Sequence, residues 1–208
     1  MTYLDDVGIS GDRVVLAHVI HADQDERALL AARGTTVAHC PSSNLKLASG
    51  ICPVPEYLSQ GIRVTLGADG APCNDRLDPF TEMRLAALLP KVRPGAGALS
   101  AWEVVRMATT DGALALGIPA GTLEAGRRAD FVLLDPDSGF ASPTAWRDDP
   151  YGPIVYSMDR SHVVATYVEG VLRYRRGEPF PLKPTGEEIA AAVAALKRRR
   201  FRGVSRKQ

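Results

Sequence analysis

The sequence has few of the residues that build disulfide scaffolds or cysteine-rich metal clusters. Among 208 residues there are three cysteines, Cys40, Cys52 and Cys73. An odd number of widely spaced cysteines is not the pattern of a disulfide framework, and without a C-x-x-C pair a cysteine-rich zinc site is not supported. Nothing in the sequence marks Cys73 as a thiolate nucleophile.

Excess charge and long apolar runs are also missing. The formal net charge is +1, with 25 basic and 24 acidic residues, which gives no argument for nucleic acid or an acidic membrane as a partner. No apolar run approaches the ~18 residues of a membrane span, and the N-terminus lacks the pattern of a signal peptide. We therefore expect a cytoplasmic protein of one domain, or one domain with a small appendage.

The first ninety residues alternate between strand-like and helical patterns. Short apolar runs predict strands at 14–17, 35–38 and 62–67, and helical spacing predicts helices at 22–33, 54–60 and 78–89. Asp23 and Asp78 are expected to cap the first and third of these helices. The order βαβαβα predicts an α/β fold with a parallel sheet and helices on its faces.

Three polar residues lie at or just beyond the ends of these strands. They are His18, His39 and Asp69. Because the C-terminal ends of parallel strands share one edge of the sheet, we expect the three side chains to converge on one pocket. Taken singly, each has a simpler interpretation: His18 as a structural histidine, His39 as a residue that orients a loop, and Asp69 as a turn aspartate.

The second half of the sequence changes character. It predicts helix over 95–120, a strand at 129–134, mostly loop over 136–157, two strands around a Glu169-Gly170 turn within 162–174, and a helix at 185–200. The basic residues after position 196 suit a solvated helix end, with an interaction tail as the alternative.

Long collinear motifs then indicate a family. They are AHVIH, AHCPSSNLKLASG, TLGADGAPCNDRLDPFTEMRLAALL, MATTDGALALGIPAGTLEAGRRADFVLLD and YVEGVLRYRRGE. Over about residues 5–180, the chain resembles the C-terminal half of the amidohydrolase superfamily. The similarity is to the aminohydrolase branch that includes S-adenosylhomocysteine deaminase, guanine deaminase and triazine chlorohydrolases.

The resemblance implies a specific division of the chain. Residues 1–120 would form the C-terminal part of a distorted (β/α)8 TIM-like barrel, about strands six to eight. Residues 121–180 would form part of a small β-sandwich domain, and residues 181–208 a C-terminal helix with a basic tail.

The resemblance also implies catalytic roles. Such enzymes hold a zinc or iron ion at the strand ends of the barrel. Asp69 would bind this metal and take a proton from the attacking water, and His18 would contact a small-molecule substrate and polarise it. The flanking residues Gly67 and Gly70 are expected to permit close approach and unusual dihedral angles around Asp69.

Further residues would shape the substrate pocket. By the same resemblance His39 would line the site, and Asn44, Asn74 and Glu82 would form its wall. Read without the resemblance, the two asparagines suit turns equally well, and Glu82 suits either a surface charge or a lid over the pocket.

The sequence departs from the family pattern in its metal ligands. None of its four histidines forms the H-x-H pair or the H-x-x-E motif of the family. We therefore expect an amidohydrolase acting on non-peptide C–N bonds, by deamination, that is incomplete and inactive alone. It would require an N-terminal half-barrel partner or a homo-oligomer. The alternatives are a non-catalytic remnant and a partner-binding half-barrel.

Overall fold

The computed structural model describes residues 1–92, 95, 97–137, 148–178 and 185–202, with side chains of the last helix as far as residue 195. The contacts divide the chain into two compact units, Met1–Arg175 and Arg176–Gln208. The expected domain boundary at residue 120 stays a prediction.

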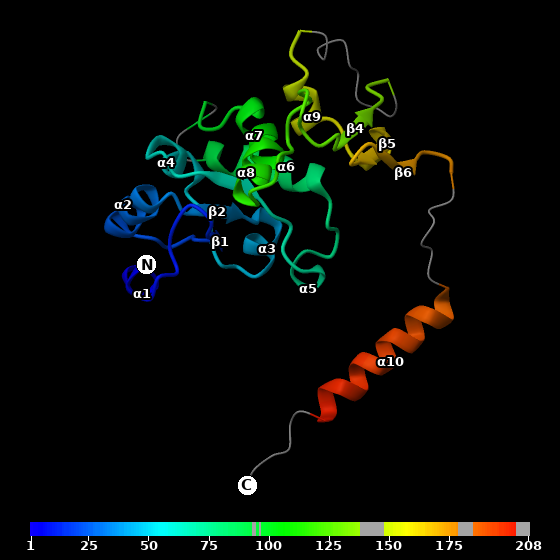
Figure 1. Ribbon diagram of the computed structural model, residues 1–208, viewed down its shortest axis with the longest axis horizontal. Coiled ribbons are helices and arrows are strands. Elements are labelled where there is room, and N and C mark those ends of the chain that lie inside the picture. Colours follow the sequence, from blue (N-terminus) through cyan, green and yellow to red (C-terminus); the bar gives the residue numbers. More distant parts are fainter. Residues whose placement is uncertain (93–94, 96, 138–147, 179–184, 203–208) are drawn as a thin grey trace. The chain divides into compact units, whose positions relative to one another are not determined.

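A parallel three-stranded sheet forms the centre of the first unit. Its strands β1 (Val15–Ala17), β2 (Thr36–His39) and β3 (Val64–Leu66) lie in the order β1-β2-β3. The neighbouring strands β1 and β2 are labelled in Figure 1. All neighbours are parallel. The chain crosses from β1 to β2 through α2 (Gln24–Arg33), and from β2 to β3 through α3 (Pro41–Lys46) and α4 (Val54–Ser59). The predicted parallel βα arrangement is therefore confirmed.

Helix boundaries follow from local capping chemistry. The Asp23 side chain accepts a hydrogen bond from the backbone of Glu26, whose side chain accepts one in return, so α2 begins with a capping box. The helix ends at Gly34, whose φ of 69° places it in the left-handed region that glycine adopts without strain. Asp78 caps α6 (Pro79–Leu88) through the backbone of Phe80. These caps were predicted and are confirmed.

The outer face of β3 is covered by helices. Helices α7 (Ala101–Ala108) and α8 (Thr110–Ala115) contact β3, and α6 and α9 (Tyr151–Tyr156) pack on α7. A cluster of buried, mainly apolar residues forms the core and includes Leu30, Val37, Tyr57, Val64 and Met107. Burial of this surface is the main source of stability for the unit.

Several short helices are absent from the prediction. They are α1 (Thr2–Asp6), α3, α5 (Ala71–Asn74), the 3-10 helices η1 (Leu89–Val92) and η3 (Arg160–His162), and α9. Helix α9 corrects the expectation of mostly loop over 136–157, of which residues 138–147 lie outside the described part. Helices of four to six residues depend on tertiary packing, so their local sequence signal is weak.

A second sheet, antiparallel, follows in the order β4-β5-β6. Its strands are β4 (Phe131–Leu134), β5 (Val163–Val168) and β6 (Val171–Arg175). Glu169 and Gly170 connect β5 to β6 with φ of 53° and 73°. Two successive left-handed residues are typical of a tight hairpin turn, so the predicted Glu169-Gly170 turn is confirmed.

The second unit contains the helix α10 (Gly186–Arg202). Thr185 and Glu188 exchange hydrogen bonds at its start, which forms a capping box. Its side chains beyond residue 195 lie outside the described part, so the roles of the basic residues stay predictions. Across the described residues, we find no helix with the length and apolar character of a membrane span.

A buried hydroxyl group joins the sheet to its covering helices. Thr65 Oγ1 donates a hydrogen bond of 2.9 Å to the carbonyl oxygen of Met107. We predict that Thr65→Val lowers the free energy of unfolding by about 1–2 kcal/mol, because a buried carbonyl loses its partner while the side-chain shape is kept. Urea denaturation checks this, with Thr166→Val in the other sheet as the control. Equal midpoints for Thr65→Val and the unaltered protein would contradict it.

Candidate functional site

Two side chains meet where β1 and β3 end. His18 follows β1 directly, and Asp69 lies three residues beyond β3. His18 Nε2 is 3.8 Å from Asp69 Oδ2, and the two side chains are 39% and 28% exposed. The structure therefore brings together the two residues for which the sequence predicts catalytic roles, and it leaves both accessible to a ligand.

The backbone at both positions is strained. His18 has a φ of 69° and Asp69 a φ of 61°, and the β-branched residue Val19 has a φ of 41°. Non-glycine residues in the left-handed region cost free energy, and they are concentrated at functional sites. The chain thus turns sharply at the ends of β1 and β3 and presents the two side chains to each other.

The neighbouring glycines match the expectation only in part. Gly70 has a φ of −74° and a ψ of 155°, which any residue can adopt, so it supplies no unusual dihedral angle. A Cβ at Gly67 would lie 3.0 Å from the sulfur of Cys40, so this glycine permits close packing. The unusual dihedral angle belongs to Asp69 itself.

The short helix α3 holds both functional side chains. Ser43 Oγ donates a hydrogen bond of 2.5 Å to Asp69 Oδ2. The next residue, Asn44, places its Oδ1 atom 2.8 Å from His18 Nδ1. Because an amide oxygen only accepts hydrogen bonds, Nδ1 of His18 is the donor, and Nε2 is the nitrogen that faces Asp69. Ser43 was missed by the sequence analysis, and its only signal was its place beside Asn44.

Hydrogen bonds keep Asp69 ionised. The Ser43 hydroxyl group and the backbone N–H of Gly70 both donate to its carboxylate, and together with the charge of His18 they lower its pKa below the usual value. Stabilisation of the charged form outweighs the small opposing effect of desolvation. Asp69 is therefore a carboxylate at neutral pH, as a metal ligand or a proton acceptor must be.

His39 is enclosed at the end of β2. Its side chain is 1% exposed, and its Nδ1 atom has no hydrogen-bond partner among the described residues. Burial, and to a smaller extent the nearby charge of His18, lowers its pKa to about 4, so the ring is neutral at pH 7. Its predicted contact with a substrate stays a prediction.

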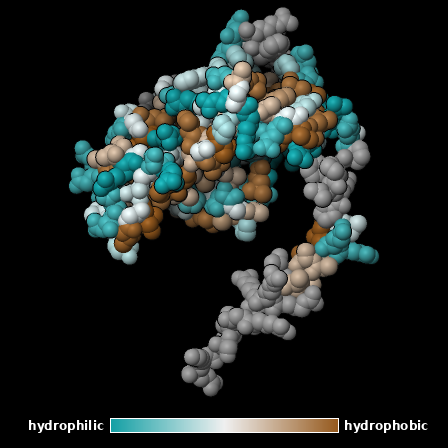
Figure 2. Space-filling view, in the orientation of Figure 1, coloured by the Kyte–Doolittle hydropathy of each residue, from teal (hydrophilic) through white to brown (hydrophobic). Residues whose placement is uncertain are grey.

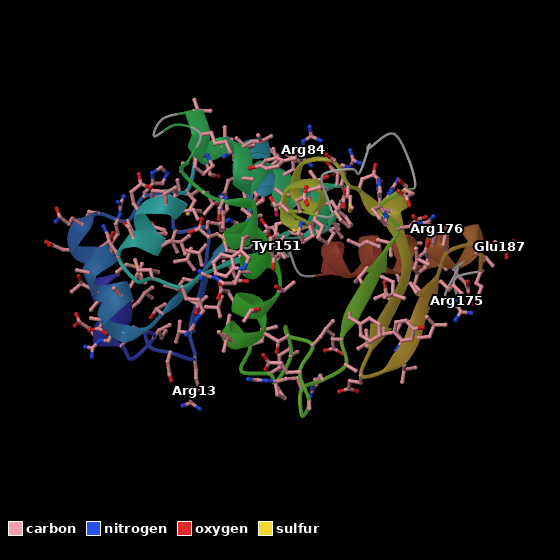
Figure 3. The ribbon with its side chains drawn as sticks, turned by 90° about the horizontal axis from the view of Figure 1, so that it is seen from above. Arg13, Arg84, Tyr151, Arg175, Arg176 and Glu187 are labelled. Carbon is pink, nitrogen blue, oxygen red and sulfur yellow. The ribbon has the colours of Figure 1, made fainter. Side chains whose placement is uncertain are left out.

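Asn74 and Glu82 are buried and bonded to each other. Asn74 Nδ2 donates to Glu82 Oε1 at 2.7 Å, and Glu82 Oε2 accepts from the backbone of Ser42 at 3.1 Å. These contacts join α5, α6 and α3, and contact with a substrate stays a prediction for Asn44, Asn74 and Glu82. Arg84, two residues after Glu82 on α6, is exposed and points outward (Figure 3).

Side chains that could bind a metal ion do not cluster among the described residues. In the part of the chain that the structure describes, no group of three or more histidine, cysteine, aspartate or glutamate residues could hold one. Burial, and to a smaller extent the nearby charge of Asp69, raises the pKa of the Cys40 thiol to about 11. That Asp69 binds a metal ion stays a prediction.

Comparison with known proteins places this geometry in a family. The sequence profile of the Amidohydrolase family matches residues 1–173. The chain is 44% identical over 195 residues to 5'-deoxyadenosine deaminase of Methanothermobacter thermautotrophicus, covering 93% of this chain and 45% of that protein. It is 39% identical over 199 residues to 5-methylthioadenosine/S-adenosylhomocysteine deaminase of Haloarcula marismortui, covering 94% and 45% respectively.

Solved structures agree with the sequence comparisons. An adenosine deaminase from Xanthomonas campestris with bound zinc is 34% identical, with a TM-score of 0.83, covering 98% of this chain and 46% of that one. Atrazine chlorohydrolase from Arthrobacter aurescens TC1, complexed with zinc, is 32% identical with a TM-score of 0.78, covering 94% and 43%. The chain thus spans less than half the length of the proteins that it matches.

The hydrogen bond from Ser43 to Asp69 should affect how the stability of the fold depends on pH. A carboxylate with a lowered pKa stabilises the fold above its unfolded-state pKa, and this contribution is lost as the pH falls through the folded-state pKa. We expect Ser43→Ala to raise the folded-state pKa of Asp69, so that this contribution is smaller and its loss is complete at a higher pH. Titration of the Asp69 carboxyl carbon by ¹³C NMR measures this, with Ser42→Ala as the control. Identical titration curves for both variants would contradict it.

Proposed function

This chain belongs to the amidohydrolase family, and we propose that it carries part of the active site of a zinc-dependent hydrolase that deaminates an adenine-type ring. The observation that carries the proposal is the His18–Asp69 pair, in a chain 39–44% identical to the deaminases described above. Both relatives are named as deaminases, and deamination is the hydrolysis of a non-peptide C–N bond. Iron as the metal and the cytoplasm as the location stay predictions.

Asp69 is the type of residue that binds zinc in proteins. An aspartate oxygen is a usual zinc ligand, and Asp69 is ionised and partly exposed. A catalytic zinc site has three protein ligands, and Asp69 would be one of them. We propose that the other ligands come from polypeptide outside these 208 residues. When bound, a divalent ion lowers the pKa of water towards about 7 and so supplies hydroxide at neutral pH.

Asp69 would also move the proton. Its carboxylate accepts a proton from the attacking water and later gives it to the departing amine. Water adds to the ring carbon that bears the amino group, the C–N bond breaks, ammonia leaves and a carbonyl group remains. The hydrogen bonds from Ser43 and Gly70 hold the carboxylate in one orientation during these transfers.

His18 would stabilise charge on the substrate. Its Nδ1 donates to Asn44, so the ring orientation is set by a buried amide that is 2% exposed. When both ring nitrogens are protonated, Nε2 is a donor directed to the side of Asp69, where the substrate would lie. A donor in this position stabilises negative charge that develops on the ring as water adds.

The open edge of β1 supports a partner for this chain. Strand β1 ends the order β1-β2-β3, and Val15 and Ala17 are exposed on it. Apolar side chains also reach the surface in and beside α1, among them Val7 and Ile9 (Figure 2). Unpaired strand edges beside apolar surface favour pairing with further polypeptide. We propose that the N-terminal half of an amidohydrolase barrel, from a separate chain, pairs with β1.

Activity should depend on Asp69 in a reconstituted pair. We expect this chain, co-expressed with the N-terminal half of the Methanothermobacter relative and loaded with zinc, to release ammonia from 5'-deoxyadenosine. Asp69→Asn should lower the rate by a factor of about 10² or more, because it removes the proton acceptor. The exposed Asp12→Asn is the matched control. Full activity in Asp69→Asn would overturn the proposal.

Association should depend on the edge of β1. We expect Val15→Lys to abolish co-purification with the N-terminal half, because a charge on the edge strand opposes pairing. The exposed Leu116→Lys on the helical face is the control, and circular dichroism verifies that both variants fold. Unchanged co-purification would contradict the proposal. A self-associated chain that Val15→Lys dissociates, seen by analytical ultracentrifugation, would favour a homo-oligomer instead.

A further inference from the structure

The side chain of Glu82 is a carboxylate enclosed by protein. It lies on α6 and is only 2% exposed. A buried carboxylate is costly unless its oxygens are hydrogen-bonded. Both oxygens have partners: Oε1 accepts from Asn74 Nδ2 at 2.7 Å, and Oε2 accepts from the backbone N–H of Ser42 at 3.1 Å. These two partners lead to two different parts of the chain at Asp69, its preceding backbone and its side chain.

The first path leads to the backbone before Asp69. Asn74 Nδ2 also donates to the carbonyl oxygen of Ala68, at 2.7 Å. The amide cannot flip, because its Oδ1 atom accepts from the backbone N–H groups of Arg76 and Leu77 at 3.2 and 3.0 Å. Glu82 and Asn74 thus fix the carbonyl group of the residue directly before Asp69.

The second path leads to the side chain of Asp69. Glu82 Oε2 holds the backbone of Ser42 in the first turn of α3. The next residue, Ser43, donates to Asp69 Oδ2 at 2.5 Å. One carboxylate on α6 therefore anchors both the backbone that precedes Asp69 and the hydroxyl group that orients its side chain.

We propose that Glu82 is a positioning residue for Asp69, which acts through Asn74 and Ser42 and does not itself bind the substrate. Its role as an aid to the reaction rests on the function proposed above. Asp69 has a φ of 61°, and such a backbone persists only where the surroundings over-determine it. The two paths from Glu82 supply this constraint. Both oxygens of Glu82 accept hydrogen bonds from the protein itself, so we assign this side chain no contact with a ligand.

Glu82→Gln tests the proposal with almost no change in shape. The new amide nitrogen cannot accept a hydrogen bond, so either Ser42 N–H or Asn74 Nδ2 loses its acceptor. In the ¹⁵N-labelled 208-residue chain, we expect the amide signals of Ser42, Asp69 and Gly70 to shift. Their exchange with solvent should be about tenfold faster, as for a lost hydrogen bond. Signals of the β5–β6 hairpin should stay unchanged.

Two further variants separate positioning from general destabilisation. Glu56→Gln makes the same change at an exposed site on α4, and its Asp69 and Gly70 signals should match the unaltered chain. Asn74→Ala removes the path to Ala68 and should alter Asp69 and Gly70 while leaving the Ser42 amide protected. Unchanged Asp69 and Gly70 signals in Glu82→Gln would overturn the proposal. If Glu82→Gln does not fold, unchanged Gly70 in Asn74→Ala overturns it.

Activity supplies a second, separable readout. In the reconstituted pair, Glu82→Gln should lower kcat and leave KM close to that of the unaltered protein, because substrate contacts are kept while Asp69 is misplaced. A raised KM with unchanged kcat would overturn the proposal in favour of substrate binding. If the unaltered pair turns nothing over, the proposed function fails, and the amide signals still decide the position of Asp69.

Discussion

Parallel pairing of β1, β2 and β3 aligns the ends of three strands, and the geometry of the candidate site depends on this alignment. In this register Leu16 pairs with Val37, and Val37 with Val64, so the chain leaves β1 and β3 at the same edge of the sheet. Residues that are 51 positions apart in sequence, His18 and Asp69, therefore come within 3.8 Å of each other. The buried apolar side chains of these strands hold this register, because a slip by one residue would expose them to solvent.

Helix α3 converts this alignment into a defined arrangement of side chains. It contains six residues, and successive residues Ser43 and Asn44 bind Asp69 and His18. A helix this short is not stable by itself. It packs on α5 and α6, and its Ser42 backbone N–H donates a hydrogen bond to the buried carboxylate of Glu82. The strained backbone at His18 and Asp69 is thus compensated by hydrogen bonds from a layer of residues behind the site.

Much of the fold was predictable because its signals are local. The caps at Asp23 and Asp78 and the Glu169-Gly170 turn each involve residues at most three positions apart, and the structure confirms them. The short helices α3, α5 and α9 were missed for the opposite reason. Their stability comes from distant partners that the local pattern does not contain.

Some features of the candidate site were likewise predictable from the sequence, and others were not. The sequence by itself determined that polar residues follow the ends of successive strands, because apolar periodicity locates the strands and parallel strands share one edge. It also determined the family, through motifs that extend over most of the chain. Only the tertiary structure decided that Ser43 orients Asp69, that Asn44 orients His18, and that Glu82 is buried behind them. Those contacts join residues 26 to 40 positions apart, and such distances are set by packing of the whole unit and leave no periodic trace in the sequence.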